Sequence, residues 1–347
     1  MSLIPATILT GFLGSGKTTL LKRVLTEAHG QKIAVIENEF GEENIDSDIL
    51  VSETKEQIIQ MSNGCICCTI REDLRDTLQL LAAKKRKGLL DFDRVVIETT
   101  GLADPGPVAQ TFFMDDEIAE TYLLDSIITL VDAKHAGKQL DDRQEARRQV
   151  GFADQIFISK ADLVAKDEVD ALVHRLKHMN PRAPMKPVHF GEVPVSEVFD
   201  LRGFNLNAKL DIDADFLKED EHEHEHGDHD HDHHEHGEHC DHPHHHRVDD
   251  DVKSFVFRSP RPFDPAKLED FLGAIVNIYG PRMLRYKGVL SMNGTERKVI
   301  FQGVHQLMGS DLGPQWQAGE TRESKMVFIG IDLPRDIFLQ GLEQCLA

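Results

Sequence analysis

The sequence lacks the features of membrane and secreted proteins. No stretch approaches the roughly 18 consecutive apolar residues of a membrane-spanning helix. The N-terminus enters a strand-like stretch without the basic region and cleavage site of a secretory signal. Cysteine is scarce as well, with five residues of which three cluster between positions 65 and 68, and this does not suit a disulfide framework. We therefore expect a soluble, cytoplasmic protein with no membrane partner.

Positive charge is also scarce. The chain has 39 Lys and Arg against 60 Asp and Glu, for a formal charge of -21. Residues 219–246 hold 11 of the acidic side chains and no Lys or Arg, so removing them leaves -10 for the rest of the chain. Proteins that bind nucleic acid contact its phosphates through Lys and Arg. We therefore do not expect nucleic acid as a partner.

A glycine-rich loop lies between an apolar, strand-like stretch at 6–10 and a helical pattern at 20–25. It fits the phosphate-loop pattern G-x-x-x-x-G-K-[ST], in which backbone N–H groups and a helix N-terminus surround phosphate oxygens. Lys17 would reach the β- and γ-phosphates, and the Thr18 hydroxyl would bind Mg²⁺. A chance glycine turn is disfavoured by the complete order of strand, loop and helix. The expected nucleotide-binding residues are Gly11, Gly14, Ser15, Gly16, Lys17, Thr18 and Thr19.

Alternating strand and helix patterns follow this loop. Buried strands are expected at 33–36, 94–97, 126–132 and 154–159, and helices at 70–87 and 138–150. Such alternation is typical of parallel βαβ units whose sheet is covered on both faces. We therefore predict an α/β fold over residues 1–205, a parallel-sheet domain that carries the P-loop.

The chain then changes character twice. Residues 206–251 are rich in His, Asp and Glu and contain 13 of the 19 histidines, so we expect a mobile linker. From 252 to 347, three or four strands with two flanking helices predict a small α+β C-terminal domain. Its strands are expected near 252–257, 283–292, 298–301 and 326–331, and its helices over 265–278 and 334–346.

Two further segments would complete a nucleotide site. Glu98 ends a buried strand, where its carboxylate can support the Mg²⁺ shell, and the Gly101 backbone can approach the γ-phosphate. Ser159-Lys160-Ala161-Asp162 has the form of the Asn/Thr-Lys-x-Asp turn that binds guanine through its carboxylate and packs its lysine over the base. Ser159 replaces the usual first residue but can still donate a hydrogen bond. A polar turn that caps a helix is the alternative for this second segment.

The sequence Cys65-Ile66-Cys67-Cys68 places three thiols within four residues. A disulfide in so short a span would be strained. Thiolates suit zinc, and a structural zinc site normally has four ligands, so three thiolates leave one position for an acid, water or an incoming ligand. That arrangement favours metal transfer over permanent storage. Inert buried cysteines and a redox thiol remain the alternatives.

The order of these motifs suggests a switch. Residues 37–42 and the thiols both lie between the phosphate loop and Glu98, the interval in which the γ-phosphate orders segments of nucleotide switches. We therefore hypothesise that Glu37 or Glu42 completes the metal site in one nucleotide state. The histidine tract could concentrate or buffer Zn²⁺, Ni²⁺, Cu²⁺ or Co²⁺, or it could be a solvated linker only.

Together these residues resemble the CobW family of metal-handling GTPases, of the SIMIBI class, and most closely its zinc-chaperone members. The resemblance implies a GTPase domain followed by a CobW C-terminal domain, zinc bound at Cys65, Cys67 and Cys68, and GTP hydrolysis that drives zinc delivery to client metalloproteins. The motifs that carry it are Gly11–Thr19, Glu37–Glu42, Gly64–Cys68, Glu98–Gly101, Ala103–Pro105, Ser159–Asp162 and Arg285–Gly288, together with the His-rich linker.

The sequence thus predicts a GTP-hydrolysing metallochaperone that uses GTP, Mg²⁺ and Zn²⁺, with Co²⁺ or Ni²⁺ as alternative metals. Lys17, Thr18 and Glu98 would be catalytic, and Asp162 would bind the base. We find no water-positioning glutamine or arginine finger and therefore expect slow unassisted hydrolysis. A nucleotide-gated metal buffer, a nickel- or cobalt-delivery GTPase and a small-molecule kinase are the alternatives. A client metalloprotein is the expected partner, and the chain could also form a homo-oligomer.

Overall fold

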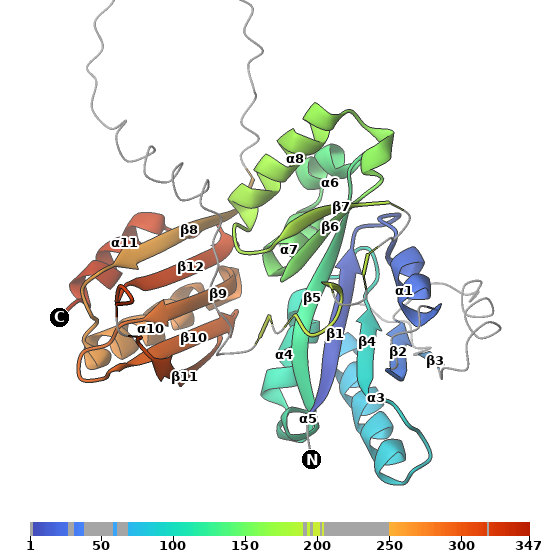
Figure 1. Ribbon diagram of the computed structural model, residues 1–347, viewed down its shortest axis with the longest axis horizontal. Helices are drawn as coiled ribbons and strands as arrows, with labels where there is room; N and C mark the ends of the chain where they lie inside the picture. The colour runs from blue at the N-terminus through green and yellow to red at the C-terminus, as the bar shows by residue number, and fades with distance from the viewer. Residues whose placement is uncertain are drawn as a thin grey trace, which may run out of the picture.

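The computed structural model describes residues 3–26, 31–37, 58–60, 69–189, 193–194, 197–201, 203–204, 250–317 and 319–347. These residues form two domains that lie side by side, each built on one β-sheet (Figure 1). The predicted fold class, an α/β domain with a parallel sheet followed by a small α+β domain, is confirmed. Most of the expected linker at 206–251 lies outside the described residues.

The N-terminal domain contains a seven-stranded parallel sheet with the strand order β3-β2-β4-β1-β5-β6-β7. Parallel sheets are buried on both faces, which explains the continuous apolar runs in the sequence. The strands are β1 (Ile4–Gly11), β2 (Ile33–Glu37), β3 (Ile58–Gln60), β4 (Arg94–Glu98), β5 (Tyr122–Asp132), β6 (Gln155–Ser159) and β7 (Met185–Val188).

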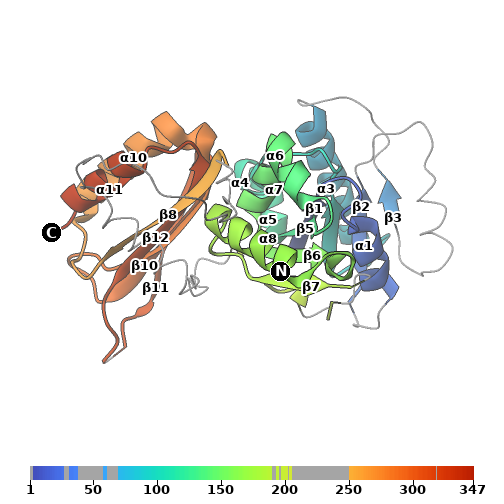
Figure 2. The same ribbon diagram turned by 90° about the horizontal axis from the view of Figure 1, so that it is seen from above.

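Helices cover both faces of this sheet (Figure 2). One face packs against α3 (Thr69–Arg86), α4 (Pro105–Met114), α5 (Asp116–Thr121), α6 (Ala136–Asp142), α7 (Gln144–Phe152) and α8 (Lys166–Met179). The other face packs against α1 (Lys17–Thr26) and against apolar side chains at positions 193–199. No helix in the described part of the chain is long and apolar enough to cross a membrane.

The single helix expected at 138–150 is wrong, because the chain forms α6 and α7 with a break at Arg143. Arg143 has extended backbone angles, with φ -130° and ψ 112°. The guanidinium of Arg147 donates hydrogen bonds to the carbonyls of Leu140 and Asp141, at 2.5 and 3.1 Å. Carbonyls at a helix end need partners from outside the helix. Arg147 supplies them here and so stabilises the break.

The C-terminal domain contains a five-stranded antiparallel sheet with the order β11-β10-β9-β12-β8, covered on one face by two helices (Figure 2). Three or four strands were expected, and β11 is the one that was missed. It is an exposed edge strand that contains Gly and Pro, so it has no apolar alternation. The elements are β8 (Val252–Ser259), α10 (Pro265–Tyr279), β9 (Met283–Leu290), β10 (Arg297–Val304), β11 (Leu307–Gln315), β12 (Ser324–Ile331) and α11 (Arg335–Gln344).

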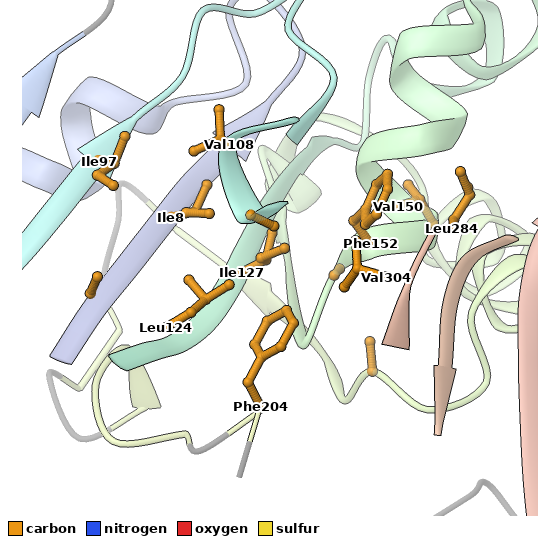
Figure 3. Packing of buried hydrophobic residues seen from close by; sticks show 14 of the residues in the cluster. Ile8, Ile97, Val108, Leu124, Ile127, Val150, Phe152, Phe204, Leu284 and Val304 are labelled. Carbon is orange, nitrogen blue, oxygen red and sulfur yellow. The ribbon is translucent and has the colours of Figure 1, made fainter. Parts of the chain in front are cut away.

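One hydrophobic core runs through the boundary between the two domains. Val150 and Phe152 of α7 belong to the same buried cluster as Leu284 of β9 and Val304 of β10 (Figure 3). All four side chains are at most 2% exposed. The cluster continues to Ile127 in the middle of the parallel sheet. Since burying apolar area is the main driving force for packing, this shared core fixes how the two domains sit relative to each other.

Candidate functional site

The residues predicted to bind a nucleotide meet at one edge of the parallel sheet. The strands β2, β4, β1, β5 and β6 end there at Glu37, Glu98, Gly11, Asp132 and Ser159. Parallel strands present their carboxyl ends together, and ligands of open α/β sheets bind at that edge. Residues that are up to about 150 positions apart in the sequence therefore line one site.

The phosphate loop has the backbone that its glycines predict. Gly11, Gly14 and Gly16 have φ values of 145°, 75° and 99°, which glycine adopts without strain. A Cβ atom on Gly11 would lie 2.4 Å from the carbonyl oxygen of Leu130, so no other residue fits there. The buried Ser15 Oγ has no hydrogen-bond partner among the described residues. A concave loop of this kind before a helix N-terminus fits a phosphate group.

The catalytic residues predicted from the sequence lie beside this loop. The ammonium of Lys17 donates to the carbonyl of Gly11 at 2.9 Å. The hydroxyl of Thr18 donates to Oε1 of Glu98 at 3.3 Å. Glu37 is buried and is the register partner of Glu98, so the two residues point to the same face of the sheet. The Glu98 carboxylate and the Thr18 hydroxyl are hard oxygen ligands, which suit Mg²⁺, and Glu37 lies beside them.

The turn predicted to bind guanine is attached to the phosphate loop. The hydroxyl of Ser159 donates to the carbonyl of Ser15 at 2.6 Å. Lys160 has a left-handed backbone with φ 56°, and its ammonium donates to the carbonyl of Gly14 at 2.9 Å and to Asp132 at 2.6 Å. The serine that departs from the usual motif therefore has a defined role in joining the two loops.

Sequence reasoning missed Asp132 as a site residue. Its carboxylate is 1% exposed and accepts hydrogen bonds from Lys160 and from Nδ1 of His135, at 2.6 and 2.9 Å. Burial would raise the pKa of Asp132, but these hydrogen bonds and the charge of Lys160 hold it below its usual value. Asp132 is therefore an anion at neutral pH that orients Lys160. An acid at the end of a buried strand, as with Glu98, was the signal that could have identified it.

His189 was missed as well. It directly follows β7, and its Nδ1 lies 3.3 Å from the carboxylate of Asp162. The side chain of Asp162 is 40% exposed, so it can accept hydrogen bonds from a ligand. No sequence pattern marks His189, because only the parallel pairing of β6 with β7 brings it to Asp162.

Gly101 lies directly against the phosphate loop. A Cβ atom at this position would be 2.6 Å from the backbone nitrogen of Leu13. The hydroxyl of Thr99 donates to that of Thr10 at 2.8 Å, which joins the end of β4 to β1. The segment that follows Glu98 therefore lies directly against the phosphate loop.

The predicted metal ligands are only partly described. Cys65, Cys67, Cys68 and Glu42 lie outside the described residues, whereas Glu37 ends β2 beside Glu98. Within the described ranges, no group of three or more His, Cys, Asp and Glu side chains is arranged to hold a metal ion. The thiolate site therefore stays a prediction.

Comparisons with known proteins identify both domains. The family model "CobW/HypB/UreG, nucleotide-binding domain" matches residues 5–187, and "Cobalamin synthesis protein cobW C-terminal domain" matches 252–346. The zinc chaperone YjiA of Escherichia coli is 39% identical over 97% of this chain and 96% of that protein. The zinc chaperone CobW of a Sinorhizobium species is 31% identical over 94% and 93%. The crystal structure of Zn(II)-bound YjiA GTPase from E. coli is 33% identical, covers both chains completely and superposes with a TM-score of 0.76.

Proposed function

The chain belongs to the CobW family and is a GTPase, and we propose that it is a cytoplasmic metallochaperone for zinc. It binds Zn²⁺ as cargo at Cys65, Cys67 and Cys68 and transfers the ion to a client metalloprotein in a nucleotide-dependent way. Relatives named zinc chaperones and a zinc-bound structural neighbour support zinc as the metal. The proposed units are a GTPase domain at 1–205, a linker at 206–251 and a CobW C-terminal domain at 252–347.

We assign the nucleotide-binding roles from the geometry of the site. The loop from Gly11 to Thr19 binds the phosphates, and Asp162 binds guanine with Ser159 and Lys160 as its support. Thr18 and Glu98 would hold Mg²⁺, which neutralises charge on the β- and γ-phosphate oxygens when it is bound. Lys17 exchanges its bond to the Gly11 carbonyl for the phosphates of GTP. These groups position and neutralise the triphosphate, which is the main contribution of a protein to phosphoryl transfer.

The observation that carries the metal assignment is the position of Glu37. It is the register partner of Glu98 on one side and of Gln60, the last residue of β3, on the other. Gln60 is only five positions before Cys65. β3 therefore ends at the edge of the sheet where Thr18 contacts Glu98, and the thiols follow it closely in the sequence. Glu37 can thus serve as the fourth ligand to zinc, with Glu42 as the other candidate.

A competition titration tests this function. We expect the affinity for Zn²⁺, measured against a chelating dye, to differ between the GDP-bound protein and the protein with a non-hydrolysable GTP analogue, because coupling between two sites is reciprocal. Cys65→Ser with Cys67→Ser should remove the high-affinity ion and leave GTP binding intact. Equal zinc affinities in both nucleotide states would contradict a chaperone.

A transfer assay separates the chaperone from its alternatives. A chaperone should release zinc to an apo-metalloprotein faster when GTP is hydrolysed than when the analogue is bound. Nucleotide-dependent retention without a requirement for hydrolysis would indicate a metal buffer. Tighter binding and faster transfer of Ni²⁺ or Co²⁺ than of Zn²⁺ would indicate a delivery GTPase for those metals.

A further inference from the structure

Gln149 is a buried amide whose hydrogen bonds serve one loop of the nucleotide site. It lies on α7, is 1% exposed, and its Nε2 donates to the carbonyls of Gly101 and Ala103, at 3.1 and 3.0 Å. A side-chain amide has two N–H donors, and both are used here. Its position is fixed in turn, because the hydroxyl of Thr129 donates to the backbone carbonyl of Gln149 at 2.8 Å.

The loop that Gln149 holds is a tight turn. The backbone N–H of Ala103 donates to the carbonyl of Thr100 at 3.1 Å, which closes the turn around Gly101. Gly101 also lies against Leu13 of the phosphate loop. The Gly101 N–H lies in one peptide plane with the Thr100 carbonyl, so the hydrogen bond from Ala103 to that carbonyl restricts the direction of the Gly101 N–H. By holding the carbonyls of Gly101 and Ala103, Gln149 fixes the turn in which this hydrogen bond forms.

The neighbouring residue of α7 holds the end of the same loop. The guanidinium of Arg148 donates to Oδ2 of Asp104 at 2.6 Å. Oδ1 of that carboxylate accepts the N–H of Gly106 at 2.9 Å and so caps α4. Two consecutive residues of α7 therefore fix the loop from its glycine to the start of the next helix.

We propose that Gln149 is a positioning residue for the GTPase reaction, which holds the turn of residues 100–103 so that the Gly101 N–H can donate to the γ-phosphate. Gln149 touches neither the nucleotide nor Mg²⁺ and acts through the turn. Because GDP has no γ-phosphate, Gln149 determines how strongly the protein prefers GTP over GDP. The inference rests on the proposed nucleotide site and on the approach of the Gly101 backbone to the γ-phosphate that the sequence predicts.

The test compares two nucleotides in Gln149→Met, which keeps the size of the side chain and removes both donors. We expect the affinity for a non-hydrolysable GTP analogue with Mg²⁺ to fall by about tenfold, and the affinity for GDP to change by less than about twofold. In steady-state kinetics, kcat for GTP should fall more than KM rises if the contact strengthens in the transition state. Gln149→Asn, which keeps the amide but is one methylene shorter, gives the same comparison if the first variant does not fold.

Asn180→Leu is the matched control. Asn180 is fully buried and its Nδ2 also donates to two backbone carbonyls, those of Val150 and Ala153, at 2.8 and 2.9 Å. Each variant loses one buried amide that donates to two backbone carbonyls. Of the two residues, only Gln149 contacts the turn of residues 100–103. An unchanged preference for the GTP analogue in Gln149→Met, or an equal change in Asn180→Leu, overturns the proposal.

The variant Gly101→Ala shows whether a negative result concerns only Gln149 or also the contact of the turn with the γ-phosphate. Its Cβ atom would push the turn away from Leu13. If Gly101→Ala lowers the preference for the GTP analogue and Gln149→Met does not, the role of Gln149 is wrong and the site stands. If neither variant changes the preference, the turn is not the γ-phosphate contact, and both the role of Gln149 and the predicted role of Gly101 are wrong.

Discussion

The carboxylate of Asp154 and the guanidinium of Arg285 lie 3.0 Å apart and form a buried ion pair across the boundary between the two domains. The side chains are 2% and 1% exposed, and Arg182 contacts the same carboxylate at 2.6 Å. Burial would raise the pKa of Asp154, but the charges of Arg285 and Arg182 hold it below its usual value. The carboxylate is therefore ionised at neutral pH and compensates two buried cations.

Replacing this carboxylate should be strongly destabilising. In Asp154→Asn the two guanidinium groups stay buried without their counter-charge, and breaking a buried pair in this way typically costs about 3–5 kcal/mol. Equilibrium unfolding in denaturant measures the loss. Asp170→Asn is the control, because its pair with Lys166 is exposed to solvent and should contribute little to stability. A loss below about 1 kcal/mol in Asp154→Asn would show that the pair does not hold the domains together.

Asp154 stabilises the folded protein, whereas the buried charge of Lys287 destabilises it. It is 3% exposed on β9, and burial together with the charges of Arg182 and Arg285 lowers its pKa to about 8. The unfolded chain keeps the ordinary value of 10.5 and so binds the proton more tightly. The folded protein therefore gains stability as the pH rises from about 8 towards 10.5, and below about 8 the full penalty of the buried charge applies.

We therefore expect Lys287→Met to stabilise the protein at neutral pH, by on the order of 2 kcal/mol. Methionine fills a similar volume without a charge. Thermal unfolding at neutral pH measures the effect, and the gain should shrink in buffers of higher pH. A destabilised variant would mean that the ammonium makes contacts worth more than its desolvation.

Most of the fold and the geometry of the phosphate loop could be predicted because their signals are local. The strands of the parallel sheet are continuous apolar runs, and the glycines of the phosphate loop adopt the positive φ values that their motif requires. The acids Glu37 and Glu98 end two such runs, so their common edge follows from parallel pairing. The exposed edge strand β11 has no such pattern and was missed.

The rest depends on contacts between residues that are distant in the sequence. Asp154 and Arg285 are 131 positions apart, and each reads as an ordinary surface charge when taken alone. Gln149 lies in a polar helix, and only the fold brings its amide to Gly101. The same holds for His189 and Asp162. A single sequence carries no local signal for such pairs, whether they join the two domains or form part of the site.

His305 should make stability depend on pH. It lies in the turn between β10 and β11, where its ring packs edge-on against Phe152 and faces Asp104 and Arg148 of the N-terminal domain. Burial lowers the pKa of His305 below its usual value, in spite of the negative charge of Asp104. Above the ordinary histidine pKa, about 6.5, both states are neutral, and below it only the unfolded chain takes up the proton readily. Stability is therefore lost as the pH falls through this range.

The variant His305→Asn checks this expectation, because asparagine tolerates the left-handed backbone at this position, with φ 52°. We expect the difference in unfolding free energy between about pH 7.5 and about pH 5 to be smaller in His305→Asn than in the parent. His174→Asn, on the exposed face of α8, serves as the control. An identical pH dependence in parent and His305→Asn would contradict a neutral buried imidazole.

Asp162 should determine which base the protein accepts. Its carboxylate is an acceptor only, which suits the N1–H and the amino group of guanine, whereas an asparagine amide also presents donors. In Asp162→Asn we expect the affinity for GTP to fall by at least about 100-fold, since hydrogen bonds to a charged group contribute about 1.5–3 kcal/mol each. Xanthosine triphosphate, which has a carbonyl in place of the amino group, should bind the variant better than GTP does.

Asp170→Asn removes the same charge from a nearby exposed position and should leave the affinity for GTP unchanged. Fluorescence titration with both nucleotides measures the ratio, and the same preference for GTP in Asp162→Asn and in the parent would remove Asp162 from the base site.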